Sequence, residues 1–214
     1  MRDRKKTMKN IVKMIRGLIG EIRHSLELRK YDRFTIAEYF RKQGAQIGEG
    51  CSIIPTVLGT EPYLVKIGNH VTIAKGVHFV THDGGAWILR NEFPNIQGFG
   101  PIMIEDNCVI GMNAIIFLNV KIGRNSIVGA GSVVISDIPP NTIALGVPAR
   151  PFGSTEKYKQ KCIERWKTQQ PPDCIIEPGK NWWDSEYFYE NRGKLKRHLL
   201  GLFKQELELE CTDH

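Results

Sequence analysis

The chain has 214 residues, 41% of them hydrophobic and 25% charged. This composition is typical of a globular protein with one sizeable core, and it excludes disordered and collagen-like chains. The formal net charge is +7, but residues 1–45 carry 13 lysines and arginines against 5 acidic residues, whereas the remaining 169 residues carry 17 against 18. Basic residues are not spread over the whole chain and no recognition motif accompanies them, so we predict no nucleic-acid partner.

Targeting and cross-linking signals are missing from the sequence. No stretch approaches the ~20 uncharged apolar residues of a membrane span, since Lys13, Arg16 and Glu21 interrupt the most apolar one. The N-terminus has no apolar region with a small-residue cleavage site, so we expect a cytoplasmic protein. Five cysteines without a CxxC pair make a disulfide framework or a zinc site improbable, and we predict no metal.

The basic N-terminal segment, residues 1–45, begins with an amphipathic pattern. Apolar residues at three- and four-residue spacing predict a helix over residues 8–30; they are Met8, Ile11, Val12, Ile15, Leu18, Ile19, Ile22 and Leu26. Either this stripe packs on the rest of the protein or on a neighbouring subunit and caps its core, or residues 1–30 make a peripheral contact with anionic lipid. We favour packing and keep the membrane contact as the alternative.

The central segment, residues 46–153, repeats with a period of six. An aliphatic residue recurs at every sixth position, and a small or aliphatic residue stands four positions after each. The first series is Ile104, Ile110, Ile116, Ile122, Val128 and Val134, and the second is Cys108, Ala114, Val120, Ser126, Ser132 and Ile138. A period of six fits neither an α-helix nor a meander of hairpins.

Such a period predicts a solenoid of short strands, each contributing one large side chain to the interior. Glycine and asparagine recur between the strands, where tight corners require unusual backbone angles. Coils stacked about 4.8 Å apart would pair their backbone groups and build one continuous core. We therefore predict a mainly β fold, a parallel β-helix with helical extensions at both ends.

The period fails between residues 80 and 101, which are rich in glycine. The insertion is either a tolerated corner loop or the wall of an acceptor pocket, because long loops in compact domains are often functional. His82 stands where the chain leaves the repeat, Asp83 follows it, and Trp87 lies within the loop 83–101.

The repeats resemble the hexapeptide-repeat acyltransferases over about residues 44–153. The segments that carry the resemblance most clearly are residues 60–68, 80–85 and 144–150, the last reading Ala-Leu-Gly-Val-Pro-Ala-Arg. The chain looks most like the maltose/galactoside acetyltransferases and polysaccharide O-acetyltransferases. This resemblance implies a left-handed parallel β-helix with three faces per coil, acetyl-CoA as co-substrate, and a homotrimer with active sites between neighbouring solenoids.

The resemblance also implies roles for residues near the loop. His82, in Thr-His-Asp, matches the family's catalytic histidine. An imidazole with an ordinary pKa near 6.5 can take a proton from a hydroxyl or amine as it attacks a thioester, and can pass it to the departing thiolate. Glu61 either binds acceptor hydroxyls or is a solvated turn residue. Asp83 either orients His82 or caps the following turn, and Trp87 is a third candidate for substrate binding.

Acetyl-CoA would contact the edge of the coils. A fixed guanidinium suits phosphate oxygens, and Arg150 matches the family's terminal arginine near the nucleotide. One departure is that galactoside relatives have Thr-Lys where this chain has Ile135-Ser136, so the phosphate contact of that lysine is missing. By the same resemblance the cofactor-binding positions are Gly111, Met112, Ala130, Ile135, Ser136 and Arg150.

The C-terminal segment, residues 154–214, lies outside the repeat. Its pattern predicts a charged helix over 154–168, an end at Pro171-Pro172, and a final helix near 194–208. Aromatic residues gather between the two helices, and they either stack on a sugar or, as we favour, form an interface or core. This cluster consists of Trp182, Trp183, Tyr187, Phe188 and Tyr189.

The sequence as a whole predicts an acetyl-CoA-dependent acetyltransferase that modifies a hydroxyl of a sugar or polysaccharide precursor, with His82 as general base. One alternative is N-acylation of an amino sugar on a nucleotide carrier. Another is a non-catalytic hexapeptide-repeat scaffold. A scaffold would need neither His82 with its loop nor the segment 146–150.

Overall fold

The computed structural model describes residues 2–55, 57–172 and 185–209, without side-chain detail for residues 2–10, 21, 185–191, 206, 208 and 209. The chain divides into two compact units, residues 1–155 and 156–214. The first unit contains the helices α1 (Arg2–Leu28) and α2 (Ile36–Lys42) and the strands. None of the described helices is long and apolar enough to cross a bilayer.

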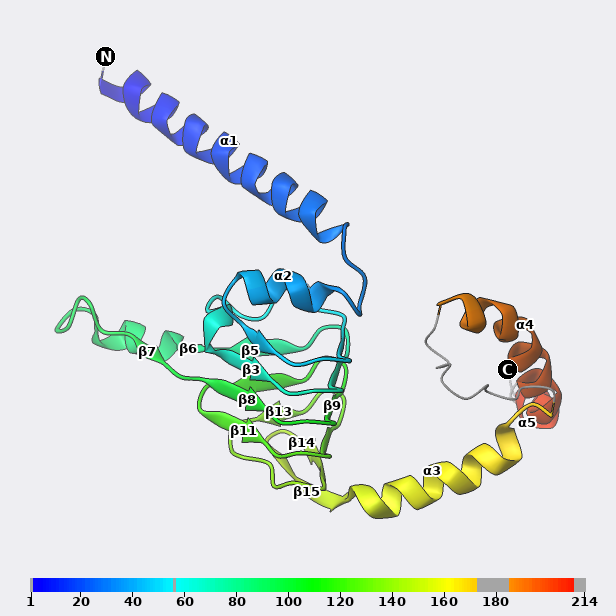
Figure 1. Cartoon of the computed structure of the whole chain (residues 1–214). Coiled ribbons are helices and arrows are strands. Elements are labelled where there is room, and N and C mark those ends of the chain that lie inside the picture. The colour runs from blue at the N-terminus through cyan, green and yellow to red at the C-terminus, as the bar shows by residue number, and fades with distance from the viewer. Residues whose placement is uncertain (1, 56, 173–184, 210–214) are drawn as a thin grey trace. The chain divides into compact units, whose positions relative to one another are not determined.

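Most strands of the first unit belong to three parallel sheets (Figure 1). Sheet 1 consists of β1 (Gln46–Ile47), β3 (Val65–Ile67), β8 (Ile102–Ile104) and β11 (Val120–Ile122). Sheet 2 consists of β2 (Ser52–Ile53), β4 (Thr72–Ile73), β9 (Val109–Ile110), β12 (Ile127–Val128) and β14 (Thr142–Gly146), with β15 (Ala149–Ser154) added antiparallel. Sheet 3 consists of β5 (His78–Val80), β10 (Ile115–Phe117) and β13 (Val133–Val134).

The register of the sheets shows how the chain winds. Ile102 pairs with Val120 in sheet 1, Val109 with Ile127 in sheet 2, and Ile115 with Val133 in sheet 3. Each pair is eighteen residues apart, which is three hexapeptides. The chain therefore visits the three faces in turn, as the period of six predicts.

The core lies inside these coils and consists of the repeated side chains. Every aliphatic of the series from Ile104 to Val134 is at most 2% exposed, and every residue of the second series is at most 3% exposed. Burying one such aliphatic side chain contributes about 1.5–3 kcal/mol. Cys108 is fully buried as expected of a small apolar residue, and burial raises the pKa of its thiol.

The open end of the first coil is covered by α2, not by the predicted stripe of residues 8–30. Four residues of α2 are buried, and Phe40 among them is 0% exposed. Arg41 fastens this helix to the coil, because its guanidinium donates to the carbonyl oxygens of Ile47 at 2.9 Å and Gly48 at 2.7 Å. The apolar stripe of α1 stays exposed within the chain, so the prediction that it caps its own solenoid is wrong: α2 already supplies the apolar surface that the coil needs.

The corner between sheets 1 and 2 carries a ladder of stacked amide side chains. Asn107 donates to Asn125 at 2.9 Å, and Asn125 donates to Asn141 at 2.9 Å. His70 extends the ladder through a 2.8 Å contact with Asn107. All four residues have positive φ, with 57° at Asn125. Asparagine suits these positions because it tolerates the left-handed conformation and can hydrogen-bond along the stack.

Asn125→Val is expected to lower the free energy of unfolding by about 3 kcal/mol. A β-branched residue at this φ costs about 1–2 kcal/mol, and the two lost hydrogen bonds cost roughly 1 kcal/mol each. Asn125→Gly should lose only the two side-chain hydrogen bonds, without the cost of the left-handed backbone, and so should be destabilised less than Asn125→Val. Urea unfolding of both variants measures the difference, and equal destabilisation would show that the left-handed backbone is not what selects asparagine here.

The second unit is helical where it is described. It contains most of α3 (Thr155–Gln169), and all of α4 (Ser185–Leu202) and α5 (Lys204–Leu209). No residue of α3 is buried. Trp182 and Trp183 lie outside the described residues, as do the side chains of Tyr187, Phe188 and Tyr189, so the role of the aromatic cluster stays a prediction.

Candidate active site

The loop 83–101 forms an arm that leaves the coils after β5. At its base β6 (His82–Asp83) pairs antiparallel with β7 (Gly98–Phe99). The short helix η2 (Gly84–Leu89) follows β6. Figure 1 shows this arm projecting from the stack, and the pairing places His82 at the point where it departs. Thr81, just before it, is 0% exposed and accepts from the amide of Gly100 at 3.0 Å.

Beside the arm's base, Glu61 faces His82. Its Oε2 lies 3.3 Å from Nδ1 of the imidazole, and Thr60 Oγ1 lies 2.9 Å from the same nitrogen. Oε2 also accepts from Thr60 at 2.6 Å and from Thr81 at 2.5 Å. Glu61 precedes the short helix η1 (Pro62–Leu64), in the connection that follows β2.

The hydrogen bonds fix which imidazole nitrogen carries the proton. The only proton on the Thr60 hydroxyl goes to Glu61, and an ionised carboxylate can only accept. Nδ1 of His82 must therefore be the donor towards both oxygens. In the neutral ring Nε2 then keeps the lone pair. Among the residues that the structure describes, none is hydrogen-bonded to Nε2, and 48% of the side chain is exposed.

The Glu61 carboxyl is ionised at neutral pH. Burial, which leaves only 14% of its side chain exposed, raises its pKa, but hydrogen bonds from Thr60, Thr81 and His82 outweigh burial and lower the pKa below its usual value. The ionised carboxylate lies 3.3 Å from Nδ1 and holds the imidazole ring in place. The site can therefore act as a general base held by a fixed anion.

The lowered pKa of Glu61 makes a prediction about stability. A carboxyl whose folded pKa lies below its unfolded value stabilises the protein above the unfolded value, and the benefit is lost as pH falls through the folded pKa. The wild type should therefore exceed Glu61→Gln in stability by a constant margin down to about pH 4.5, the ordinary value. Below it the margin should shrink. Urea unfolding from neutral to acid pH tests this, and a margin independent of pH would contradict it.

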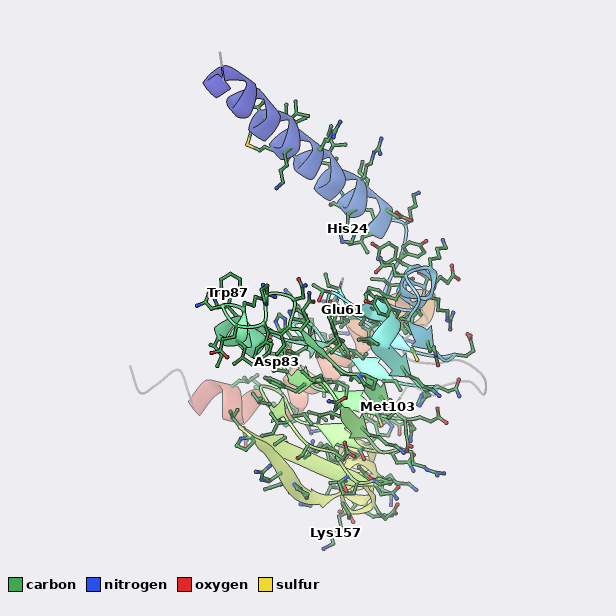
Figure 2. All side chains as sticks on the ribbon, turned by 90° about the vertical axis from the view of Figure 1, so that its left-hand side faces the viewer. His24, Glu61, Asp83, Trp87, Met103 and Lys157 are labelled. Atoms are coloured by element: carbon green, nitrogen blue, oxygen red, sulfur yellow. The ribbon has the colours of Figure 1, made fainter. Side chains whose placement is uncertain are left out.

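The other two candidates for substrate binding lie on the arm. Asp83 accepts from the amide of Gly85 at 2.8 Å and so caps η2. The carboxylate that faces His82 is thus Glu61, and the role of Asp83 in binding substrate stays a prediction. Trp87 is 70% exposed, with the guanidinium of Arg90 5.0 Å from its ring centre. Figure 2 shows Trp87 and Asp83 on the arm and Glu61 beside the coils.

Three of the six predicted cofactor-binding positions, Gly111, Met112 and Ala130, lie on one edge, which we call the glycine corner. It consists of residues 111–114 and 129–132, between sheets 2 and 3, and of residues 146–149 in the turn from β14 to β15. Gly111 and Ala130 lie on successive coils, so close that a side chain at Gly111 would come within 2.5 Å of the Ala130 amide nitrogen. Gly131 donates to the Met112 carbonyl at 2.8 Å. Met112 is 52% exposed and Ala130 is also exposed.

Arg150 lies at the end of the glycine corner. It pairs with Leu145 in the β14–β15 hairpin, and its guanidinium donates to the Ala149 carbonyl at 3.1 Å while the side chain stays exposed. The amide of Gly146 donates to Ser132 at 3.2 Å and ties the hairpin to the coil below. The exposed cation is thus available to a ligand that lies along this corner.

Ile135 and Ser136 lie on a different edge, which we call the histidine corner because His82 leaves the coils there. Val134 pairs with Ile116, and Phe117 pairs with Val80. Ile135 directly follows β13 and Thr81 directly follows β5, so both leave sheet 3 at the same edge, two coils apart. Within one chain, the imidazole and the glycine corner belong to different edges of the prism.

Thr60 and Thr81 are the site residues that sequence reasoning missed. Both hydroxyls donate to Glu61, and each precedes a predicted site residue in the sequence. The available signal in the sequence was a threonine directly before each of the two predicted site residues, Glu61 and His82. In the described ranges, no three His, Cys, Asp or Glu side chains are arranged to hold a metal ion.

The comparisons with known proteins agree with this architecture. A family model for a hexapeptide repeat of succinyl-transferase matches residues 101–136. Protein CapG of Staphylococcus aureus is 47% identical over 142 residues, which cover 65% of this chain and 83% of that protein. The chain belongs to the hexapeptide-repeat acyltransferase family.

Two further proteins are similar to this hexapeptide-repeat acyltransferase. Galactoside O-acetyltransferase of Escherichia coli is 43% identical over 96 residues, 42% of this chain and 44% of that protein, so the match spans less than half of that relative. A hexapeptide-repeat-containing acetyltransferase of Vibrio cholerae superposes with a TM-score of 0.50 at 27% identity, covering 67% of this chain and 92% of that one. The superposition shows a shared fold.

Proposed function

We propose that this protein transfers the acetyl group of acetyl-CoA to a hydroxyl of a sugar or polysaccharide precursor, as a homotrimer of left-handed β-helices. The observation that carries the proposal is that Nδ1 of His82 contacts Glu61 and Thr60 while about half of the side chain is exposed, which makes Nε2 the ring nitrogen that can take a proton from an acceptor. The family supplies acyl transfer, and the likeness to a galactoside O-acetyltransferase supports a sugar hydroxyl.

In the proposed reaction, Nε2 of His82 takes the proton of the acceptor hydroxyl as that oxygen attacks the thioester carbon. The new carbon–oxygen bond replaces the carbon–sulfur bond, and the imidazolium returns its proton to the leaving thiolate. Glu61 keeps the ring oriented and stabilises its transient positive charge, so it is a positioning residue. Its Oε2 is occupied by three donors, which leaves Oε1 for the predicted contact with the acceptor.

The separation of the glycine corner from the histidine corner within one chain supports an assembly in which two chains share each site. Pantetheine along the glycine corner of one chain would not lie on the edge that carries that chain's own His82. A second copy whose histidine corner faces this glycine corner completes the site. The phosphates of acetyl-CoA would then reach the exposed Arg150 at the end of the corner.

Arg150→Ala is expected to raise KM for acetyl-CoA by about 10- to 100-fold with little change in kcat, because a hydrogen bond to a charged group contributes about 1.5–3 kcal/mol. Arg150→Lys should recover part of this loss. Arg124→Ala, which removes an exposed arginine from the corner between sheets 1 and 2, is the matched control and should leave KM unchanged. Equal KM values for all the proteins would remove Arg150 from the cofactor site.

Thiol release from acetyl-CoA in the presence of galactosides, maltose and amino sugars tests the proposed activity. Mass spectrometry and NMR of the product identify the acetylated atom. An O-acetyl product is expected, whereas an N-acetyl product would favour the alternative acceptor, since a histidine base serves either nucleophile. No thiol release together with no acetyl-CoA binding would contradict the proposal and favour a non-catalytic scaffold.

A further inference from the structure

The helix α1 presents an apolar stripe that nothing else in the described chain covers. Its residues have between 43% and 57% of their surface exposed, although residues of this kind are usually buried. The first coil is closed by α2, and the stripe is not packed on the described part of its own chain. The members of the stripe are Ile11, Val12, Ile15, Leu18, Ile19, Ile22 and Leu26.

The charge of α1 indicates what could cover the stripe. Residues 4–20 contain six lysines and arginines and no acidic residue. At 3.6 residues per turn the stripe spans an arc of roughly 120°, and Arg23 and Arg16 come next beyond the Val12 border of that arc. Long basic side chains beside an apolar face can extend to the phosphate level while the apolar residues enter the acyl region.

A second copy of α1 is a poor partner for this face. Residues 2–28 carry eight lysines and arginines against three acidic residues, so neighbouring helices would bring like charges together, and three copies in a trimer would concentrate this charge threefold. Attraction to an anionic lipid surface instead contributes about 1 kcal/mol to binding for each lysine or arginine near that surface. Charge therefore favours a lipid surface over self-association.

We propose that α1 docks in the plane of an anionic lipid surface, with the stripe in the membrane and its basic residues at the headgroups. Near its C-terminal end the helix contacts α2, where the Tyr39 hydroxyl lies 2.7 Å from Nδ1 of His24. Figure 2 shows His24 at that end of α1. The docked helix would thus hold the β-helix at the membrane. This inference does not depend on the proposed reaction.

Vesicle co-sedimentation of the full-length protein tests the docking, with vesicles of phosphatidylcholine alone and of phosphatidylcholine with phosphatidylglycerol. The stripe variant carries Ile15→Gln and Ile22→Gln. The matched control carries Gly17→Gln and Gly20→Gln, which places the same side chains on the other face. A charge variant carries Lys13→Gln and Arg16→Gln.

The wild type and the glycine control are expected to bind the anionic vesicles at least about tenfold more tightly than neutral ones, and high salt should weaken this binding. The stripe and charge variants should each lose about tenfold or more in affinity for anionic vesicles. Retention of the native oligomeric mass and of the circular-dichroism spectrum checks that the variants are folded.

The proposal would be overturned if the wild type bound neither kind of vesicle, or if the stripe variant bound anionic vesicles as tightly as the wild type. If the wild type bound no vesicles and the stripe variant lost oligomeric mass, the stripe would instead be a contact between copies of the chain. Vesicle binding is measured without acyl donor, so its outcome is separate from that of the proposed activity.

Discussion

Replacing His82 with alanine is expected to lower kcat for acetyl transfer by about 10²- to 10⁴-fold, the usual contribution of a general base. The variant keeps the glycine corner and Arg150, so its dissociation constant for acetyl-CoA should stay unchanged. Thiol release under saturating substrate measures the first quantity and calorimetry measures the second. A fall in kcat without a loss of binding would mark the imidazole as acting in the reaction itself.

The matched control for His82 is His78→Ala. His78 begins β5, is exposed, and lies four residues before the proposed base. Its replacement should leave kcat within error of the wild type. If His82→Ala were as active as this control, the imidazole would have no part in the chemistry, and the proposed mechanism would be wrong.

Mixing two inactive variants is expected to restore activity. His82→Ala removes the base but leaves the glycine corner intact. Ala130→Trp blocks that corner, at an exposed position where bulk is tolerated, but leaves the base intact. If each site uses the histidine of one chain and the corner of its neighbour, random trimers assembled from equal amounts contain intact sites at about a quarter of positions.

The regained activity should therefore approach about a quarter of the wild-type rate after joint refolding, far above the rate of either variant alone. Mixing without refolding is the control, since preformed oligomers that do not exchange chains cannot share sites. No recovery after joint refolding would place the whole site within one chain and would contradict the two-chain arrangement.

The core could be predicted from the sequence because the solenoid repeats one local rule. Strand geometry fixes which side chain points inward, so a period of six identifies Ile110 or Val128 as buried without knowledge of the other coils. The corner residues with positive φ were predictable for the same reason, since asparagine and glycine recur at the corners and tolerate the left-handed backbone conformation. His82 was identifiable because it stands where the repeat breaks.

The partners of His82 could not be predicted in the same way. Glu61 reaches the imidazole only because the irregular connection after β2 folds back beside β6, and no periodic rule describes that connection. Asp83 stood nearer in sequence, but its carboxylate serves the helix that begins next to it. The Asp83 carboxylate could have capped the adjacent helix or contacted His82, and in the structure it caps the helix.

The ends of the chain show a different limit. The stripe of α1 was recognisable as amphipathic, but amphipathicity does not say what covers an apolar face. The shorter helix α2, with Phe40 fully buried, caps the first coil although its seven residues give too little periodicity to be singled out. Because α2 occupies the apolar end of the first coil, the stripe of α1 remains exposed within the chain.

The most direct test of the central claim is the position of CoA in a crystal structure of the assembled protein with the bound cofactor. Pantetheine is expected along Gly111 and Ala130 of one chain, with its sulfur within hydrogen-bond reach of Nε2 of His82 in the neighbouring chain. CoA on another edge of the coils, or with its sulfur far from every His82, would contradict the account.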